Sequence, residues 1–333
     1  MEHSNTGLNP CQKVKDSCKA VMELAKHVKI NKENLLKLVE NIEETEFKYD
    51  CWEQWHFQTI PDVSQITDEQ VIAYVFIIDA LNFCFWPTEG FEYDQLANNL
   101  AKILVDDPEF FTSKRMAQAT DEDICKIFTA DFCLIQERSR LLREVGEIIE
   151  TKFEGSFSNF VSSAGGNAVK LVDQIISNFP GFRDESIYNI AGEDALKGGQ
   201  QVFFYKRVQI LVGDLYAALE NRNQSLVSQD IEQLTMFPDY RVPQILHHLG
   251  VFEYSEDLEK QIIDEEIIPH GDQKEVEIRA ATIECVEQIK GTAFEHNPNI
   301  NLKSIEVDWI LWQMGEKKLD EMKPHHRTLS IFY

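Results

Sequence analysis

The sequence predicts an all-α fold, built as one large helical domain or as two intimately packed subdomains. Its 333 residues are enough to bury a full core, and a hydrophobic fraction of 43% with 21 Phe is typical of a globular protein. Only 15 Gly and 10 Pro interrupt long apolar runs at helical spacing. We expect a flexible tail at residues 1–10, the helical domain over residues 11–333 and a hinge near residues 198–200.

The formal charge of −25 restricts the partners of the chain. Nucleic-acid backbones are bound by clustered Lys and Arg that release counterions, whereas the surface of this protein must be acidic on average. A small ligand enclosed in a pocket agrees better with this charge. We therefore expect a small-molecule substrate, no direct contact with nucleic acid, and a monomer.

Motifs for metals, nucleophiles and membranes are missing from the sequence. None of the seven Cys forms a C-x-x-C pair, and H-E-x-x-H and G-x-S-x-G are absent. The N-terminus lacks a signal-peptide core, and no apolar run reaches the length of a membrane span. We expect a soluble, reduced protein of the cytoplasm or nucleus that uses no metal or cofactor, with carboxylates and a lysine as catalytic candidates.

Most of the chain shows the apolar periodicity of amphipathic helices. Predicted helices are Lys13–His27, Lys32–Ile42, Glu92–Val105, Asp121–Phe128, Asp131–Phe153, Ala168–Asn178, Glu256–Ile268, Lys274–Lys290 and a last helix that contains Val307–Trp312. Residues 155–166 are expected to form a glycine-rich connector without a phosphate-binding pattern, and the apolar C-terminus is expected to dock. An aromatic-rich segment at residues 49–57 holds His56, which by itself is more often a packed side chain than a ligand contact.

A capping box at Thr67 begins a helix that is apolar on all sides, which predicts a buried central helix running to Trp86. At 100° per residue, one stripe of this helix holds Asp79, Asn82, Phe83 and Trp86. Polar groups inside such a helix are costly unless they are hydrogen-bonded. The stripe is either a structural hydrogen-bond cluster or a pocket wall with an aromatic plate and an amide.

A second helix that is apolar on all sides is predicted at Val202–Leu219. Lys206 shares its stripe with Val202 and Ile210, which is an unusual setting because lysine is rarely buried unless paired. The alternative is a surface lysine whose stem lies along apolar side chains. A lysine and a carboxylate in one cavity would be candidates for perturbed pKa values.

In the apolar stretch of residues 234–250, Asp239 and Arg241 stand between Pro238 and Pro243. The prolines predict a stiff, irregular connection followed by a short helix. A carboxylate on such a turn, with Phe237 beside it, suits a functional site. Taken alone, the stretch slightly favours a structural Asp239 that caps the helix or pairs with Arg241.

Five blocks of the sequence together resemble the queuosine salvage protein family. They are D-A-L-N-F-C-F-W (79–86), F-Y-K-R-V-Q-I-L-V-G-D (204–214), T-M-F-P-D-Y-R-V-P-Q (235–244), V-E-I-R (276–279) and H-R-x-x-x-I-x-Y (326–333). The similarity runs in order from about Trp55 to Tyr333. Family members commonly have alanine where this chain has Pro238.

The resemblance implies a queuosine 5′-phosphate N-glycosidase that releases queuine for reinsertion into tRNA. It also implies a fold similar to the helical DNA glycosylases of the helix-hairpin-helix type. A catalytic Lys/Asp pair of the family falls on Lys206 and Asp239. Further ligand contacts are implied at His56, Phe237 and the region Asp308–Trp312, in which Asp308 and Trp312 share a helix face with Trp309 beside them.

The chemistry of this reaction fits the candidate residues. N-glycoside cleavage passes through an oxocarbenium-like state, which Asp239 can stabilise or attack, or serve by activating water. Queuine is a 7-deazaguanine, so N7 cannot be protonated and positioned hydrogen bonds must stabilise the departing base. The candidates are Asn82 or His56 for these bonds, Phe83, Trp86, Phe237 or Trp312 for stacking, Asp308 or Asp79 for the secondary ammonium of queuine, and Lys206, Arg207, Arg241 and Arg327 for the phosphate.

Two alternative functions remain at this point. A helical base glycosylase that acts on nucleic acid would need a basic strip, which the charge of −25 opposes. A non-enzymatic helical binding protein would explain the helices, but not why Lys206, Asp79 and Asn82 lie inside apolar ones.

Overall fold

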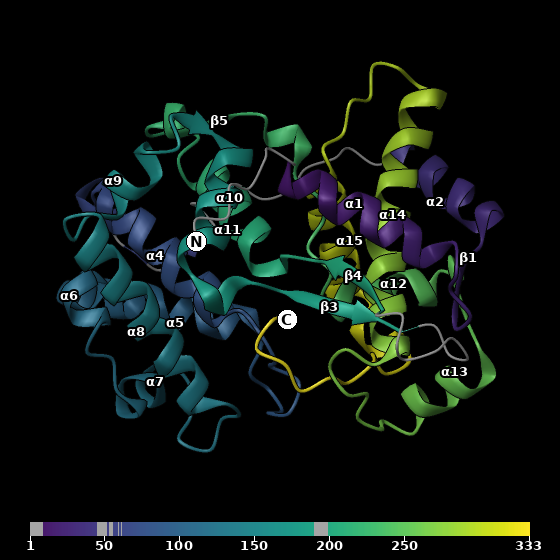
Figure 1. The fold of residues 1–333 in the computed structure, drawn as a ribbon, viewed down its shortest axis with the longest axis horizontal. Coiled ribbons are helices and arrows are strands. Elements are labelled where there is room, and N and C mark those ends of the chain that lie inside the picture. The colour runs from purple at the N-terminus through teal and green to yellow at the C-terminus, as the bar shows by residue number, and fades with distance from the viewer. Residues whose placement is uncertain (1–8, 45–51, 53–55, 59, 61, 190–198) are drawn as a thin grey trace. The chain divides into compact units, whose positions relative to one another are not determined.

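The computed structural model describes residues 9–44, 52, 56–58, 60, 62–189 and 199–333 (Figure 1). Its contacts divide the chain into two compact units. Unit 1 comprises residues 1–49, 184–206 and 232–329, and unit 2 comprises residues 50–183, 207–231 and 330–333. Of the predicted tail, residues 1–8 lie outside the described residues, and Pro10 is the buried first residue of a helix. The hinge near residues 198–200 stays a prediction, because residue 198 is not described.

Unit 1 is built around its longest helix, α14 (Gln273–His296), which is buried along much of its length. The described helices that pack most closely on it are α1 (Pro10–Met22), α2 (Lys32–Glu44), α12 (Arg241–His248) and α15 (Ser304–Lys317). Two antiparallel strand pairs join β1 (Val28–Ile30) to β6 (Phe252–Tyr254) and β3 (Glu185–Tyr188) to β4 (Gln200–Phe203). The other elements are α13 (Glu256–Ile263), η7 (Leu319–Glu321) and η6 (Ile231–Gln233), which leads into the unit.

Unit 2 is built around α4 (Asp68–Leu81), which starts at the predicted capping box of Thr67 and is buried from Val71 to Leu81. The elements that pack on it are α5 (Tyr93–Asp106), η2 (Pro108–Phe111), α8 (Ile135–Lys152) and α9 (Phe157–Ser162). The unit also contains η1 (Val63–Gln65), α6 (Ser113–Met116), α7 (Asp121–Ile127), α10 (Ala168–Asn178), η3 (Pro180–Phe182), η5 (Gln224–Leu226) and the parallel pair of β2 (Gly166–Asn167) with β5 (Val227–Gln229). Helix α11 (Lys206–Ala218) starts at the last residue of unit 1 and continues in unit 2.

The mainly helical fold is confirmed, and most predicted helices are present within a few residues. Helix α10 has the predicted bounds, and α5 is displaced by one residue. The connector predicted at residues 155–166 was wrong, because it contains α9, where Ser156 caps the helix and Phe157 and Phe160 are buried. The helix predicted from Val202 was also wrong at its start, because residues 200–203 form β4.

The predicted end of the central helix at Trp86 was wrong as well, because α4 ends at Leu81. The buried guanidinium of Arg138 on α8 donates to the carbonyl oxygens of Leu81 and Phe83, both at 2.6 Å, and of Cys84 at 3.2 Å. These bonds satisfy carbonyls that a continued helix would have paired with later N–H groups. A cation from another helix therefore replaces the next turn of α4.

The C-terminus docks within unit 2, as predicted. The carbonyl oxygen of Tyr333 accepts a hydrogen bond from the Cys84 N–H at 3.0 Å, and the Tyr333 side chain is buried.

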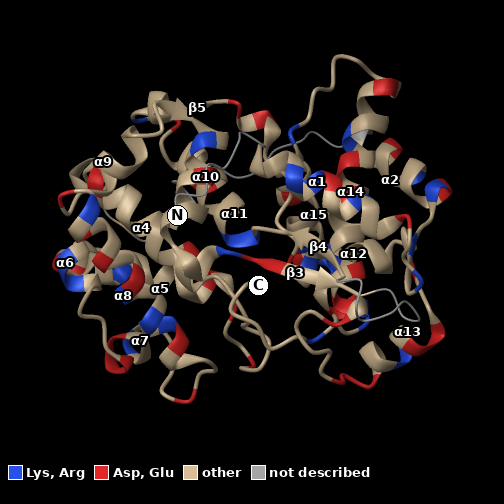
Figure 2. Cartoon of the chain, in the orientation of Figure 1, with Lys and Arg blue, Asp and Glu red and all other residues tan. Residues whose placement is uncertain are grey.

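Acidic and basic residues are interspersed along the described helices (Figure 2). In the described part of the chain, no helix is both long and apolar enough to cross a bilayer.

Replacing Arg138 by leucine should lower the free energy of unfolding by roughly 3 kcal/mol or more, because buried carbonyl oxygens lose a charged donor. The matched control is Arg140→Leu on the same helix. Arg140 forms ion pairs with Glu137 and Glu144 in a partly exposed position, so its loss should cost less than about 1 kcal/mol. Urea denaturation measures both variants, and equal losses would contradict this account of the end of α4.

Candidate active site

Asp239 lies at the start of α12, and its two carboxylate oxygens have different surroundings. Oδ1 accepts the N–H groups of Arg241 at 2.9 Å and Val242 at 3.1 Å, which caps the helix. Among the described residues, none donates a hydrogen bond to Oδ2. Within residues 234–243, Asp239 is the one residue that is partly exposed. The structural role predicted for Asp239, capping of the helix, is thus met by Oδ1.

The turn that carries Asp239 is shorter than the two prolines suggested. Helix α12 already begins at Arg241, so Pro243 lies in the first helical turn, where its missing N–H breaks no hydrogen bond. The helix ends at His248, and Gly250, which was predicted to stop it, adopts a φ of +68° two residues later. The irregular segment that positions Asp239 is therefore short and closely held by the helix that follows.

Lys206 is the first residue of α11, and its side chain is buried, at 3% exposure. The preceding Tyr205 has a φ of +54°, an unfavourable conformation for a residue with a side chain. The carbonyl oxygen of Asp184 accepts the N–H groups of Phe204 at 3.0 Å and Tyr205 at 3.2 Å, and its Oδ2 accepts the Lys206 N–H at 3.2 Å. Asp184 thus sets where α11 begins.

Asp184 was not found from the sequence. It follows η3 in a short loop without helical periodicity, and no motif marks it as the partner of a residue 22 positions later. The Tyr205 turn also explains why Lys206 does not share a helical stripe with Val202, as the sequence had suggested.

The charge of Asp239 is set by opposing effects. Burial raises the pKa of the Asp239 carboxyl above its ordinary value, because the ionised form loses hydration. The positive charge of Lys206 is the largest influence in the opposite direction, followed by the N–H of Val242 and the charge of Arg241. The pKa of Asp239 is thus perturbed, as expected for a candidate carboxylate, and burial is the largest cause.

Helix α15 brings Asp308 to the same turn. Its Oδ1 accepts the Phe237 N–H at 3.0 Å, and the residue is only 4% exposed. Trp309 and Trp312 on the same helix are partly exposed. Unit 1 therefore brings Lys206 and Asp308 to the short segment that contains Phe237 and Asp239.

Arg241, also predicted as a ligand contact, is held within unit 1. Its Nε donates to Glu316 Oε1 at 2.6 Å and its Nη1 to Gln244 Oε1 at 2.7 Å, and the residue is 4% exposed. These contacts favour a structural role, in which Arg241 fixes α12 to α15. Arg327, a candidate for the phosphate, likewise donates to Glu265 at 2.5 Å.

His56 of unit 2 has a defined protonation state. Burial holds the pKa of its imidazole well below the ordinary value, so the ring is neutral. The His56 Nδ1 lies 3.2 Å from the Tyr74 hydroxyl, which also lies within hydrogen-bond distance of the Ala97 carbonyl oxygen, at 3.1 Å. Trp52 stacks on the imidazole, with ring centroids 3.9 Å apart.

The predicted stripe of Asp79, Asn82, Phe83 and Trp86 was wrong, because the last three residues lie beyond the end of α4. Asn82 is buried and donates to Asp79 Oδ1 at 3.4 Å, as a hydrogen-bond cluster would require. The Phe83 ring is buried, with the guanidinium of Arg138 4.0 Å from its centroid. Trp86 is partly buried and packs against the apolar cluster that Phe83 forms with Cys84 and Leu141. This favours a structural role for Phe83.

Arg207, another phosphate candidate, is fully buried in unit 2. Its guanidinium donates to the backbone carbonyl oxygens of Ala80 and Gly181 and lies 4.7 Å from the centre of the Phe182 ring. These partners favour a structural role for Arg207.

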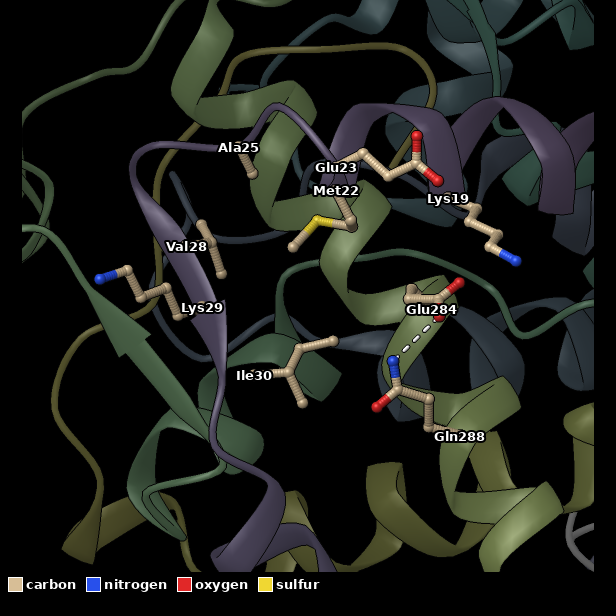
Figure 3. Close-up of a pocket in the computed structure, with 9 residues that line it drawn as sticks. All are labelled: Lys19, Met22, Glu23, Ala25, Val28, Lys29, Ile30, Glu284 and Gln288. Atoms are coloured by element: carbon tan, nitrogen blue, oxygen red, sulfur yellow. Dashed lines mark hydrogen bonds between the residues drawn. The ribbon is translucent and has the colours of Figure 1, made fainter.

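Unit 1 also has an open groove of about 440 Å³, which is lined by other residues than those described above (Figure 3). It is lined by residues of α1, β1 and α14, including Lys19, Val28 and Glu284, and by none of the predicted site residues. Among the residues that the structure describes, no group of His, Cys, Asp and Glu is arranged to hold a metal ion.

The replacement Asp239→Asn should stabilise the folded protein more at pH 7 than at pH 4. Asparagine retains an oxygen that caps α12. A carboxyl whose pKa is raised on folding loses its stabilising contribution as pH rises through the folded pKa, whereas asparagine does not titrate. The melting-temperature difference between variant and wild type should therefore increase with pH. If the melting-temperature difference is smaller at pH 7 than at pH 4, the raised pKa of Asp239 is contradicted.

Comparison with known proteins agrees with the family resemblance in the sequence. A family model described as queuosine salvage protein matches residues 62–333. A protein of Dictyostelium discoideum named queuosine 5′-phosphate N-glycosylase/hydrolase is 40% identical over 333 residues, which cover 98% of this chain and 100% of the relative. Proteins of the same name from Sphaerobacter thermophilus and Mus musculus are 38% and 35% identical, over 80% of this chain and 82% and 83% of their own lengths. This chain belongs to the queuosine salvage protein family.

Proposed function

We propose that this protein hydrolyses the N-glycosidic bond of queuosine 5′-phosphate and releases queuine. The relatives that match most of the chain carry the name of this activity. The structural observation that supports it is Asp239, a partly buried carboxylate with one oxygen held by two backbone N–H groups. The formal charge of −25 favours a small nucleotide over a nucleic-acid polymer as substrate.

Asp239 is proposed as the catalytic carboxylate. When the bond between C1′ and the base nitrogen breaks, its electron pair leaves with the base and positive charge develops on C1′ and the ring oxygen. Oδ2 is the atom that faces this charge, whether it stabilises the oxocarbenium ion, attacks C1′ or takes a proton from the incoming water. Because two N–H groups hold Oδ1, the carboxylate needs little reorganisation as the charge develops.

Lys206 is proposed to keep Asp239 ionised and to contribute a cation to the bound nucleotide. Its charge lowers the pKa of Asp239, which burial alone would raise further. A buried ammonium with a fixed backbone is also suited to a phosphate, as a compact point charge.

The segment at Phe237 and helix α15 are proposed to bind the substrate. Phe237 and Trp312 are candidates for stacking on the 7-deazaguanine ring, with Trp309 nearby on the same helix. Asp308 is the candidate counter-ion for the secondary ammonium of queuine. Its contact with the Phe237 N–H ties this carboxylate to the segment that carries Asp239.

Incubation with queuosine 5′-phosphate, followed by chromatography for free queuine, tests the activity. The wild-type protein should release queuine, and Asp239→Asn should lower kcat by at least about 10²-fold, because a preorganised charge is lost. The matched control is Asp272→Asn, since Asp272 is also a partly buried helix cap in unit 1, with its carboxylate accepting the Lys274 N–H at 2.9 Å. Near wild-type turnover by Asp239→Asn would overturn the catalytic assignment, and no release by the wild type would overturn the function.

The replacement Lys206→Met should move the acid limb of the kcat profile to higher pH. Without the lysine charge, the pKa of Asp239 rises, so the ionised carboxylate is lost at a higher pH as the solution is acidified. Steady-state kinetics between pH 4 and pH 8 measure the limb. If the variant only melts at a lower temperature, with an unchanged pH profile, Lys206 is structural.

A further inference from the structure

We propose that Arg279 on α14 is a positioning residue, which holds Lys206 and Asp239 in the relative placement that cleavage of the glycosidic bond requires. The inference rests on the proposed function and adds a residue that touches neither substrate nor reacting atoms. It is carried by the hydrogen bonds of one fully buried guanidinium group.

Arg279 is 0% exposed, and both ends of its planar fork bind the carboxylate of Asp184, while Glu275 Oε1 also lies 3.6 Å from Nη1. Nη1 donates to Asp184 Oδ1 at 2.9 Å and Nη2 to Asp184 Oδ2 at 2.5 Å. The ring of Phe204 lies against the guanidinium, 4.1 Å from its carbon atom to the ring centroid. A bidentate pair between planar groups fixes the orientation of both partners as well as their separation.

The partner carboxylate passes this constraint to Lys206. Asp184 Oδ2, which accepts from Arg279, also accepts the backbone N–H of Lys206 at 3.2 Å. The carbonyl oxygen of Asp184 holds the left-handed turn at Tyr205 through two further N–H groups. The start of α11, and with it the stem of Lys206, is therefore fixed to the guanidinium of Arg279.

The third donor of Arg279 holds the turn that carries Asp239. Its Nε donates to the Pro238 carbonyl oxygen at 3.1 Å, and this carbonyl belongs to the peptide group that immediately precedes Asp239. One side chain thus binds, on one edge, the partner of Lys206 and, on the other, the backbone of Asp239. The separation of the proposed catalytic cation and carboxylate depends on this side chain.

The test is Arg279→Lys, which keeps the charge but cannot make the bidentate bond and the Pro238 bond together. We expect kcat to fall by about 10- to 100-fold with KM changed less than about threefold, because small displacements of catalytic groups are costly. The acid limb of the kcat profile should also move to higher pH, since Lys206 no longer holds the pKa of Asp239 down.

The matched control is Glu277→Gln on the same helix. Glu277 is also fully buried, but its carboxylate accepts the N–H groups of Lys26 and His27 and the Tyr188 hydroxyl, none of which is a proposed site residue. This variant should melt at a lower temperature and keep the wild-type kcat and pH profile per folded molecule. A second variant, Asp184→Asn, retains an acceptor and serves if Arg279→Lys does not fold. It should show the same displacement of the acid limb.

A readout without substrate separates this inference from the proposed function. The melting-temperature gain produced by Asp239→Asn should increase from pH 4 to pH 7. This increase should be larger in the Arg279→Lys background, because displacement of Lys206 raises the pKa of Asp239. If the wild type releases no queuine, the proposed function fails while this measurement still tests the positioning. The inference is overturned if Arg279→Lys and Asp184→Asn both fold and behave like the wild type. That means an unchanged kcat, an unchanged acid limb of the kcat profile, and an unchanged melting-temperature gain from Asp239→Asn.

Discussion

The buried ion pair of Arg279 and Asp184 is the interaction on which the geometry of unit 1 depends. It joins α14, the segment that leads into α11 and the turn before α12, which are far apart in the sequence. Burying two charges is costly, and three hydrogen bonds offset this cost, two from Arg279 to Asp184 and one to the Pro238 carbonyl oxygen. Removal of one partner from such a pair typically costs about 3–5 kcal/mol, so stability and site geometry are coupled at this point.

Asp239 combines two roles that conflict energetically. Its Oδ1 stabilises the protein by capping α12, whereas burial of the charged carboxylate destabilises it at neutral pH. Lys206 offsets part of this cost and favours the ionised form needed for catalysis. An active-site group that lowers stability is expected where function requires a charge in a partly dehydrated place. The structural and functional interpretations of Asp239 are therefore compatible, since they concern different oxygens.

Local signals predicted elements that are formed by local interactions. The capping box of Thr67 started α4 as expected, and the apolar periodicity of residues 168–178 matched α10. Errors arose where a distant side chain decides the backbone. Arg138 ends α4 at Leu81, and Asp184 delays the start of α11 to Lys206, although the apolar pattern continues through both points. The hydrogen-bonding partner in each case comes from another segment, which periodicity does not register.

The sequence by itself determined the helical class, the central buried helix and, through the family resemblance, the choice of Lys206 and Asp239. Apolar spacing and capping residues act within a few positions, and the motif blocks are legible without coordinates. Which groups the buried arginines bind was decided only by the tertiary structure. Arg138, Arg207 and Arg241 bind carbonyl or polar side-chain oxygens inside their own units, and Arg279 supports both catalytic candidates. The reason is that a buried guanidinium must satisfy several donors at once, and the acceptors are supplied by whichever segments the fold brings beside it.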